Sequence, residues 1–248
     1  MSVMKKFFDK SKIWFAVAWI VAYCVLMSVG DALSGLIGIE KSVTLVIGAV
    51  LSAILFRFLY KNDLLSYYGL CAPKTSVRSM LCYLPILIML SANLWYGVAL
   101  NSSAIETVFC ILAMFCVGFL EEVIFRGLLF EAMRKDNVKA AIIVSSVTFG
   151  IGHIINLFNG SGAGLLPNLL QIVYATSAGF MFVMIYYRSK SLIVCIAAHG
   201  IFNALSVFAD ETDVTIGMQI LTALLLTVIT GSYALYLAFS MKDNKNDS

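Results

Sequence analysis

The chain has 248 residues, of which 61% are hydrophobic and only 12% are charged, with a formal net charge of +3. A soluble globular domain usually carries about 25% charged and about 45–50% apolar residues, so the composition excludes an ordinary soluble domain and indicates an integral membrane protein. The small net charge, without a basic run interleaved with aromatic residues, argues against nucleic-acid binding.

Eight apolar segments are long enough to cross a lipid bilayer, which requires about 20 residues in a helix. We therefore expect an all-α fold, a polytopic integral membrane protein of about eight transmembrane helices with the functional cavity inside the bundle. Short connections and an even composition predict one membrane-embedded domain, residues 1–248. The expected spans are Ile13–Gly30, Val43–Tyr60, Met80–Leu100, Ile105–Met133, Val138–Phe158, Leu165–Tyr187, Leu192–Ala209 and Ile216–Met241.

Basic residues are distributed unevenly around these segments. With eight spans, all 17 lysines and arginines except Lys41 and Arg126 lie on the same side as the two termini. Because basic residues near span ends favour the cytoplasmic side, we expect both termini in the cytoplasm. Lys74 and Arg134 should then be cytoplasmic and Glu211 external. Short connections without an organellar targeting signal favour a bacterial plasma membrane.

The fourth apolar segment, Ile105–Met133, contains charged residues in its interior. Glu121 and Glu122 are adjacent, and Arg126 follows Glu122 by four positions. A charged side chain inside a bilayer costs about 2.5–3.5 kcal/mol on insertion scales and usually faces an interior site. Helical spacing places Glu122 and Arg126 on one face, with Glu121 about 100° away. We expect Glu122 and Arg126 to form a structural ion pair and Glu121 to face a cavity.

The chain has two histidines, and both lie inside later apolar segments. Phe149 precedes His153 by four residues, and Asn203 follows His199 by four. With a helix rise of about 1.5 Å per residue, Glu121, His153 and Asn203 lie about 20 Å from the basic ends of their spans, and His199 about 14 Å. Three neighbouring spans can thus bring a carboxylate, two imidazoles and an amide to similar depth.

Small and polar residues accompany these motifs. Glycines beside the histidines should allow neighbouring helices to approach closely. Three amides within the spans could line the cavity or bridge helices. The glycines are Gly150, Gly152 and Gly200, and the amides are Asn93, Asn168 and Gln171.

Together, the three motifs resemble the CPBP intramembrane protease family. This family includes the type II CAAX prenyl proteases and bacterial relatives linked to bacteriocin self-immunity. The patterns Glu-Glu-x-x-x-Arg, Phe-x-x-x-His and His-x-x-x-Asn are all complete between Glu121 and Asn203, within a motif core of residues 104–209. The resemblance implies an intramembrane endopeptidase with an all-helical fold of about eight spans.

The resemblance also implies a role for each motif residue. Glu121 and His153 would activate a water molecule for peptide hydrolysis, while His199 and Asn203 would stabilise the oxyanion. The substrate would be a membrane-associated or lipidated protein or peptide; prenylated CAAX proteins, peptide pheromones and bacteriocin-related peptides all remain open. The supporting residues would be Glu122, Arg126 and Phe149.

The motifs favour a mechanism without a metal, and we expect no cofactor. A set of one glutamate and two histidines could nevertheless bind zinc, which leaves Glu121, His153 and His199 as alternative zinc ligands. The six cysteines form no Cys-x-x-Cys pair and are expected to be apolar fillers. Cys195, four residues before His199, is the alternative of a thiol nucleophile.

Two other functional classes remain open. A proton-coupled transporter would use intramembrane glutamate and histidine residues as a proton relay. The chain lacks the evident internal repeats and paired broken spans of many such transporters. A non-enzymatic immunity or scaffold membrane protein could keep the motifs, but it would tolerate Glu121→Gln. The sequence indicates no oligomeric state.

Overall fold

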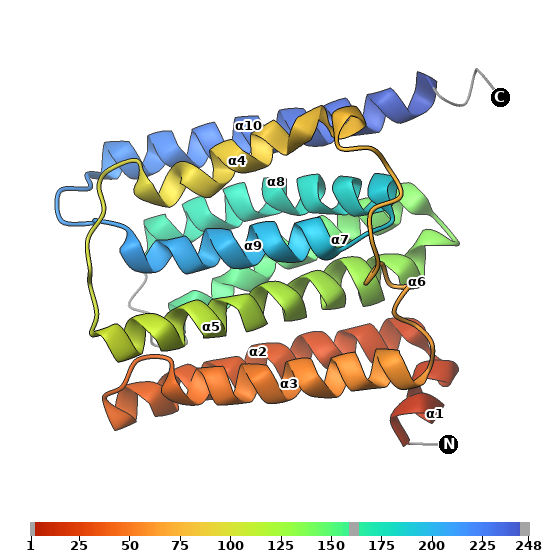
Figure 1. Cartoon of the computed structure of the whole chain (residues 1–248), viewed down its shortest axis with the longest axis horizontal. Coiled ribbons are helices and arrows are strands. Elements are labelled where there is room, and N and C mark those ends of the chain that lie inside the picture. Colours follow the sequence, from red (N-terminus) through yellow and green to blue (C-terminus); the bar gives the residue numbers. More distant parts are fainter. Residues whose placement is uncertain (1–2, 159–163, 244–248) are drawn as a thin grey trace.

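The computed structural model describes residues 3–158 and 164–243, and over these ranges the chain is a bundle of helices (Figure 1). No strand occurs in the described ranges, apart from one isolated bridge between Val98 and Ala209. The predicted all-α fold is therefore confirmed. The helices are α1 (Val3–Lys10), α2 (Lys12–Ile37), α3 (Ser42–Lys61), η1 (Arg78–Tyr83), α4 (Leu84–Ser91), η2 (Ala92–Leu94), α5 (Ala104–Glu121), η3 (Glu122–Phe130), α6 (Glu131–Arg134), α7 (Val138–Gly152), η4 (His153–Leu157), α8 (Leu165–Ser189), α9 (Ile193–Leu205), η5 (Ser206–Phe208) and α10 (Ile216–Asp243).

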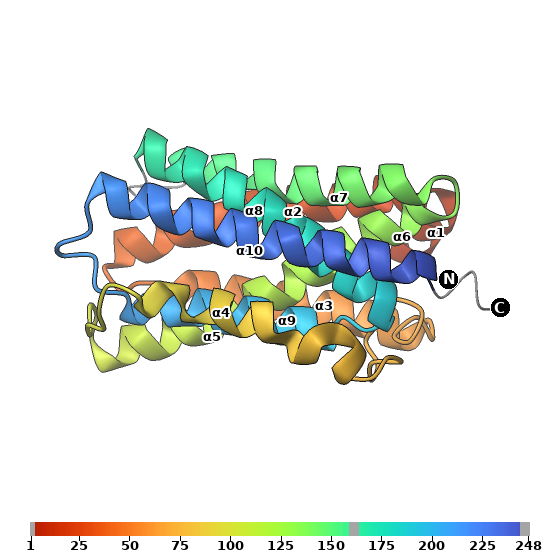
Figure 2. The ribbon, with the colours of Figure 1, turned by 90° about the horizontal axis from the view of Figure 1, so that it is seen from above.

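The long helices stack in pairs along a common direction (Figures 1 and 2). α2 and α3 form one outer hairpin, and α3 packs against α5. α5 in turn packs against α9, and α7 against α8. α4 and α10 form the opposite outer pair, over α9 and α8 respectively. Both ends of the chain lie at the same end of this bundle, on the right of Figure 1.

Within residues 3–158 and 164–243, six helices are long and apolar enough to cross a membrane. Two shorter apolar helices, Leu84–Leu94 and Ile193–Phe208, occupy the third and seventh predicted spans. The predicted count of eight is therefore not confirmed. Helix α4 is short because Leu81 and Tyr83 have positive φ angles of 49° and 54°, which interrupt the helix. The candidate spans are Lys12–Ile37, Ser42–Lys61, Ala104–Arg134, Val138–Leu157, Leu165–Ser189 and Ile216–Ser240.

Local sequence signals fix the starts of the helices that carry the central residues. The Ser11 hydroxyl accepts a hydrogen bond from the Trp14 backbone N–H at the start of α2. Ser103 and Glu106 form a reciprocal capping box at the start of α5. Such caps satisfy backbone N–H groups that have no partner within the helix. They fix the residues at which the helices that carry Tyr23 and Glu121 begin.

Glycines allow two of the helix pairs to cross closely. A Cβ atom on Gly118 of α5 would lie 2.7 Å from the backbone nitrogen of Gly200 on α9. A Cβ on Gly150 of α7 would lie 2.8 Å from the Cα of Thr176 on α8. The prediction of close approach is confirmed for Gly150 and Gly200. It is wrong for Gly152, which has no neighbouring atom within 4 Å of such a Cβ and instead borders a cavity.

This difference predicts opposite results for two neighbouring alanine substitutions. Gly150→Ala should lower the free energy of unfolding by about 1–3 kcal/mol, because the added methyl group forces α7 and α8 apart. Gly152→Ala is the matched control and should cause no loss, since alanine has the higher helix propensity and space is present. Denaturation of both purified variants in detergent measures the effect. Equal losses would contradict this description of the α7–α8 contact.

Candidate active site

The Glu-Glu-x-x-x-Arg motif lies where α5 continues into a wider helical turn. The backbone of η3, Glu122–Phe130, is a π-helix in which all nine residues are buried. η3 packs against α2, α5, α6, α7 and α8, so it is the centre of the bundle. π-helical turns are rare and occur frequently at functional sites. Helix periodicity alone did not predict this turn, since the apolar pattern of the segment fits an α-helix as well.

Glu122 binds both the arginine of its own motif and a histidine of another helix. The Arg126 Nη1 atom lies 3.0 Å from Glu122 Oε1, and both side chains are fully buried. The expected ion pair is thus present. The same oxygen lies 2.8 Å from His199 Nδ1, a contact that the sequence did not predict. A carboxylate can only accept here, so the proton resides on Nδ1 and Glu122 fixes the orientation of the His199 ring.

Phe149 connects the arginine to both histidines. The Arg126 guanidinium carbon lies 4.0 Å from the centre of the Phe149 ring and 5.5 Å from that of Phe182. The Phe149 ring centre is 5.1 Å from that of His153 and 5.6 Å from that of His199. Cation–π contacts of this kind contribute about 2 kcal/mol when they are shielded from water. Phe149 therefore forms an apolar wall against which the charged and titratable groups pack.

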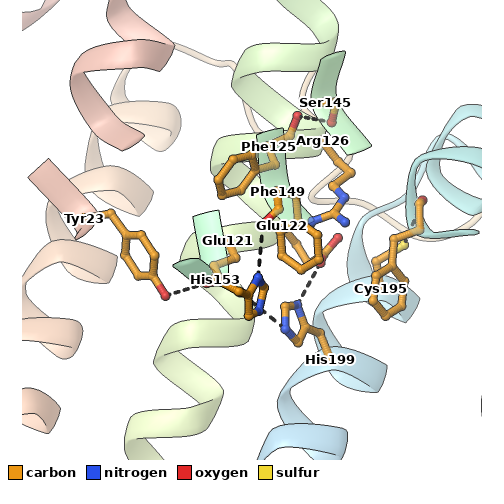
Figure 3. Close-up of polar contacts among 11 residues, drawn as sticks. Tyr23, Glu121, Glu122, Phe125, Arg126, Ser145, Phe149, His153, Cys195 and His199 are labelled. Atoms are coloured by element: carbon orange, nitrogen blue, oxygen red, sulfur yellow. Dashed lines mark hydrogen bonds and ion pairs between the residues drawn. The ribbon is translucent and has the colours of Figure 1, made fainter. Parts of the chain in front are cut away.

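Glu121 lies between a tyrosine and His199 (Figure 3). The Tyr23 hydroxyl donates a hydrogen bond of 2.7 Å to Glu121 Oε1. The other carboxylate oxygen lies 3.3 Å from His199 Nε2. An unprotonated ring nitrogen and a carboxylate oxygen are both acceptors, so these two atoms form an ion pair only when Nε2 carries a proton. The sequence did not point to Tyr23, because it lies on α2, far from the motifs, in an apolar segment where tyrosine is unremarkable.

The protonation of His153 is constrained by the backbone. Its Nδ1 atom lies 3.1 Å from the carbonyl oxygen of Phe149, which can only accept, so Nδ1 must donate. In the neutral ring this leaves the lone pair on Nε2 available as an acceptor. The Asn168 side chain donates a 2.8 Å hydrogen bond to the carbonyl of His153 and so holds the backbone there. In the described parts of the chain, no direct hydrogen bond joins His153 to Glu121.

Four of the predicted residues surround connected space within the bundle. Glu121, His153 and Asn203 line a central cavity of about 340 Å³, together with Tyr23. His199 lines a smaller recess of about 40 Å³, which shares His153 and Asn203 with the central cavity. The Asn203 side chain makes no hydrogen bond to the part of the chain that the structure describes. Glu122 and Arg126 line neither space. Glu122 contacts His199, and Arg126 contacts the Phe149 ring.

Of the three intramembrane amides, two line the central cavity and one bridges helices, which are the two roles that the sequence left open. Asn93 and Gln171 line the central cavity. Asn93 also donates a 2.6 Å hydrogen bond to the carbonyl of Phe202. Asn168 links α8 to His153 and borders neither space.

The structure shows where the alternative nucleophile Cys195 lies and how the alternative zinc ligands are arranged. Cys195 is fully buried and its Sγ lies 3.5 Å from the Phe182 carbonyl, away from the cavity. No set of three or more His, Cys, Asp or Glu side chains within residues 3–158 and 164–243 has the geometry to hold a metal ion. This finding includes the set of Glu121, His153 and His199. Both ring nitrogens of His199 already face glutamates, Nδ1 facing Glu122 and Nε2 facing Glu121. Metal independence itself stays a prediction.

Comparison with known proteins places a family match over the same part of the chain. Residues 103–205 match the family model of the type II CAAX prenyl endopeptidase Rce1-like proteins. YdiL of Bacillus subtilis (strain 168), named as a candidate membrane peptidase, is 36% identical over 85 residues. That alignment covers 34% of this chain and 30% of YdiL, so each protein is matched over about a third of its length. No solved structure matches the chain at a significant level. The family resemblance carried by the three motifs is thereby confirmed: residues 103–205 of this membrane protein match the type II CAAX prenyl endopeptidase family.

Proposed function

We propose that the protein is an intramembrane endopeptidase. The observation that carries this proposal is the convergence of Glu121, His153, His199 and Asn203, from three separate motifs, on connected space inside the bundle. The family match and the description of YdiL support a membrane peptidase in general. The proposed substrate is a membrane-associated or lipidated protein or peptide that enters from the lipid bilayer or its surface.

In the proposed reaction, Glu121 and His153 activate a water molecule in the central cavity. The water donates one hydrogen bond to Glu121 and one to the free Nε2 of His153. Glu121 then takes a proton as the water oxygen attacks the carbonyl carbon of the peptide. A positioned general base contributes about 10²–10⁴-fold to the rate of such a step. The Tyr23 hydroxyl, bound to the other oxygen of Glu121, keeps the carboxylate aimed at the cavity.

His199 and Asn203 are proposed to stabilise the tetrahedral intermediate. The protonated Nε2 of His199 and the side-chain amide of Asn203 would donate hydrogen bonds to the oxyanion. Loss of one such donor typically costs about 10²–10³-fold in turnover. The intermediate then collapses, the C–N bond breaks, and the proton held by Glu121 passes to the leaving nitrogen. One water is consumed, and one carboxyl and one amino terminus are formed.

The proposal is tested by mapping cleavage in a membrane proteome. The purified protein is reconstituted in liposomes and incubated with solubilised membrane proteins, and new peptide N-termini are identified by mass spectrometry. Wild type should generate specific new termini, and Glu121→Gln should generate none. A transporter or a scaffold would give the same termini with both proteins, and this result would overturn the proposal.

We expect the reaction to proceed without a metal. Exhaustive chelation of the reconstituted protein should therefore leave the rate of peptide hydrolysis largely unchanged. Loss of hydrolysis on chelation, restored by stoichiometric zinc, would assign a His₂Glu zinc site and overturn direct activation of water by Glu121.

The Tyr23–Glu121 hydrogen bond provides a further prediction. A hydrogen bond to a charged group contributes about 1.5–3 kcal/mol, so Tyr23→Phe should lower kcat by about one to two powers of ten. KM should change little, because the hydroxyl acts on the base and not on the substrate. Tyr60→Phe is the matched control, since Tyr60 is 65% exposed on α3 and should keep full activity. A kcat of Tyr23→Phe equal to wild type would exclude this positioning role.

A further inference from the structure

The central cavity extends from Glu121 towards one end of the bundle only. On α2 its lining residues run from Tyr23 to Asp31, which corresponds to about 12 Å along the helix. On α9 and η5 they run from Phe202 to Ser206. In each case the lining continues towards the end at which α2 turns into α3. That end lies opposite both termini, on the left of Figure 1.

The other end of the bundle is closed by packed side chains. Every residue of η3 is buried, and only Phe125 of this turn reaches the cavity. The side chains of Phe130, the last residue of η3, and of Tyr186 and Leu192 are at most 2% exposed. No described lining residue of the central cavity lies on the terminal side of Phe125. A peptide therefore has no open path to Glu121 from that end.

Two further cavities border the central one at the end of the bundle where α2 turns into α3, and each shares lining residues with it. One, of about 820 Å³, shares Ser28, Asp31 and Lys41 with the central cavity. The other, of about 400 Å³, shares Lys41, Asn203 and Ser206 with it. Lys41 thus lines all three spaces. Its Nζ atom lies 2.8 Å from Asp31 Oδ1, with 24% and 21% of the two side chains exposed, so the junction is polar and in contact with solvent.

We propose that substrate reaches Glu121 from the end of the bundle opposite the termini. With the orientation expected from the basic residues, this end faces the outside of the cytoplasmic membrane. The substrate class is then a translocated peptide segment, either an exported peptide or the external flank of a membrane protein. A lipidated tail held on the cytoplasmic side would not reach the site. This inference rests on the proposed peptidase function and on the expected orientation.

Labelling of single cysteines in intact cells tests the direction of access. All six native cysteines are replaced, and one cysteine is introduced at Ser206 or at Ser28, which line the junction between cavities. A cysteine at Asp136, an exposed residue between α6 and α7 near the termini, is the matched control. The probe is a membrane-impermeant sulfonated methanethiosulfonate, added before or after permeabilisation.

The inference predicts that Ser206→Cys and Ser28→Cys react in intact cells and that the reaction blocks peptide hydrolysis. Asp136→Cys should react only after permeabilisation. The reverse pattern, with Asp136→Cys labelled first, would overturn the inference, as would full hydrolysis by labelled protein. The labelling itself requires no catalysis. Failure of the proposed function would therefore be recognised separately, as absence of cleavage by the unlabelled wild type.

Discussion

Glu121→Gln should lower kcat by about 10²–10⁴-fold, the contribution of a general base, while the protein remains folded. Glutamine keeps the size of the side chain and can still accept the hydrogen bond from Tyr23, but it cannot take a proton from water. Glu121 borders the cavity and is 12% exposed at its side chain, so the substitution leaves no buried charge without a partner. Turnover and melting temperature, measured on the same preparation, separate the two effects.

The control for this substitution is the stability of the variant itself. The melting temperature of Glu121→Gln should stay within a few degrees of wild type. Unfolding of Glu121→Gln together with a stable, inactive Glu122→Ala would mean that the roles of the two glutamates are reversed.

Glu122→Ala should lower the free energy of unfolding by about 3–5 kcal/mol, the usual cost of breaking a buried ion pair. The fully buried Arg126 would lose the carboxylate that binds its Nη1. Its Nε and Nη2 atoms have no hydrogen-bond partner within the described residues, so no other group replaces Glu122. Activity should fall as well, because His199 Nδ1 loses its acceptor. Chemical denaturation in detergent measures the change in stability.

A double variant separates the two consequences of losing Glu122. Glu122→Ala combined with Arg126→Met removes the stranded charge and should recover much of the stability. Turnover should stay low, because nothing holds the His199 ring in place. Recovery of full turnover in the double variant would show that the Glu122–His199 contact has no part in the reaction.

The fold was largely predictable from hydrophobicity because bilayer-spanning helices are long, apolar and separated by short connections. What hydrophobicity could not show was where a helix is interrupted. The positive φ angles at Leu81 and Tyr83 shorten α4, and Pro85 lies in its first turn. Proline is tolerated at that position of a helix, so hydropathy alone did not mark it as the point where the helix begins. The short amphipathic helix α1, Val3–Lys10, was also missed. Its Phe8 is buried against Phe15 and Phe58, a contact that only the tertiary fold creates.

The site was predictable where helix spacing determines the geometry and unpredictable where tertiary contacts do. Spacing of four residues was sufficient to pair Glu122 with Arg126. It could not show that His199 lies between Glu121 and Glu122, because that depends on the close α5–α9 crossing at Gly118. The contribution of Tyr23 likewise depends on how α2 packs against the motif, which its own sequence does not encode.

The central claim is that water activated by Glu121 attacks the peptide bond directly. Single-turnover hydrolysis in ¹⁸O-labelled water, followed by mass spectrometry of both products and of the intact protein, tests it. We expect one ¹⁸O atom in each new carboxyl terminus, no covalent peptidyl–protein species at any time, and no product with Glu121→Gln. A peptidyl adduct on the protein, or unchanged product formation by Glu121→Gln, would contradict the claim.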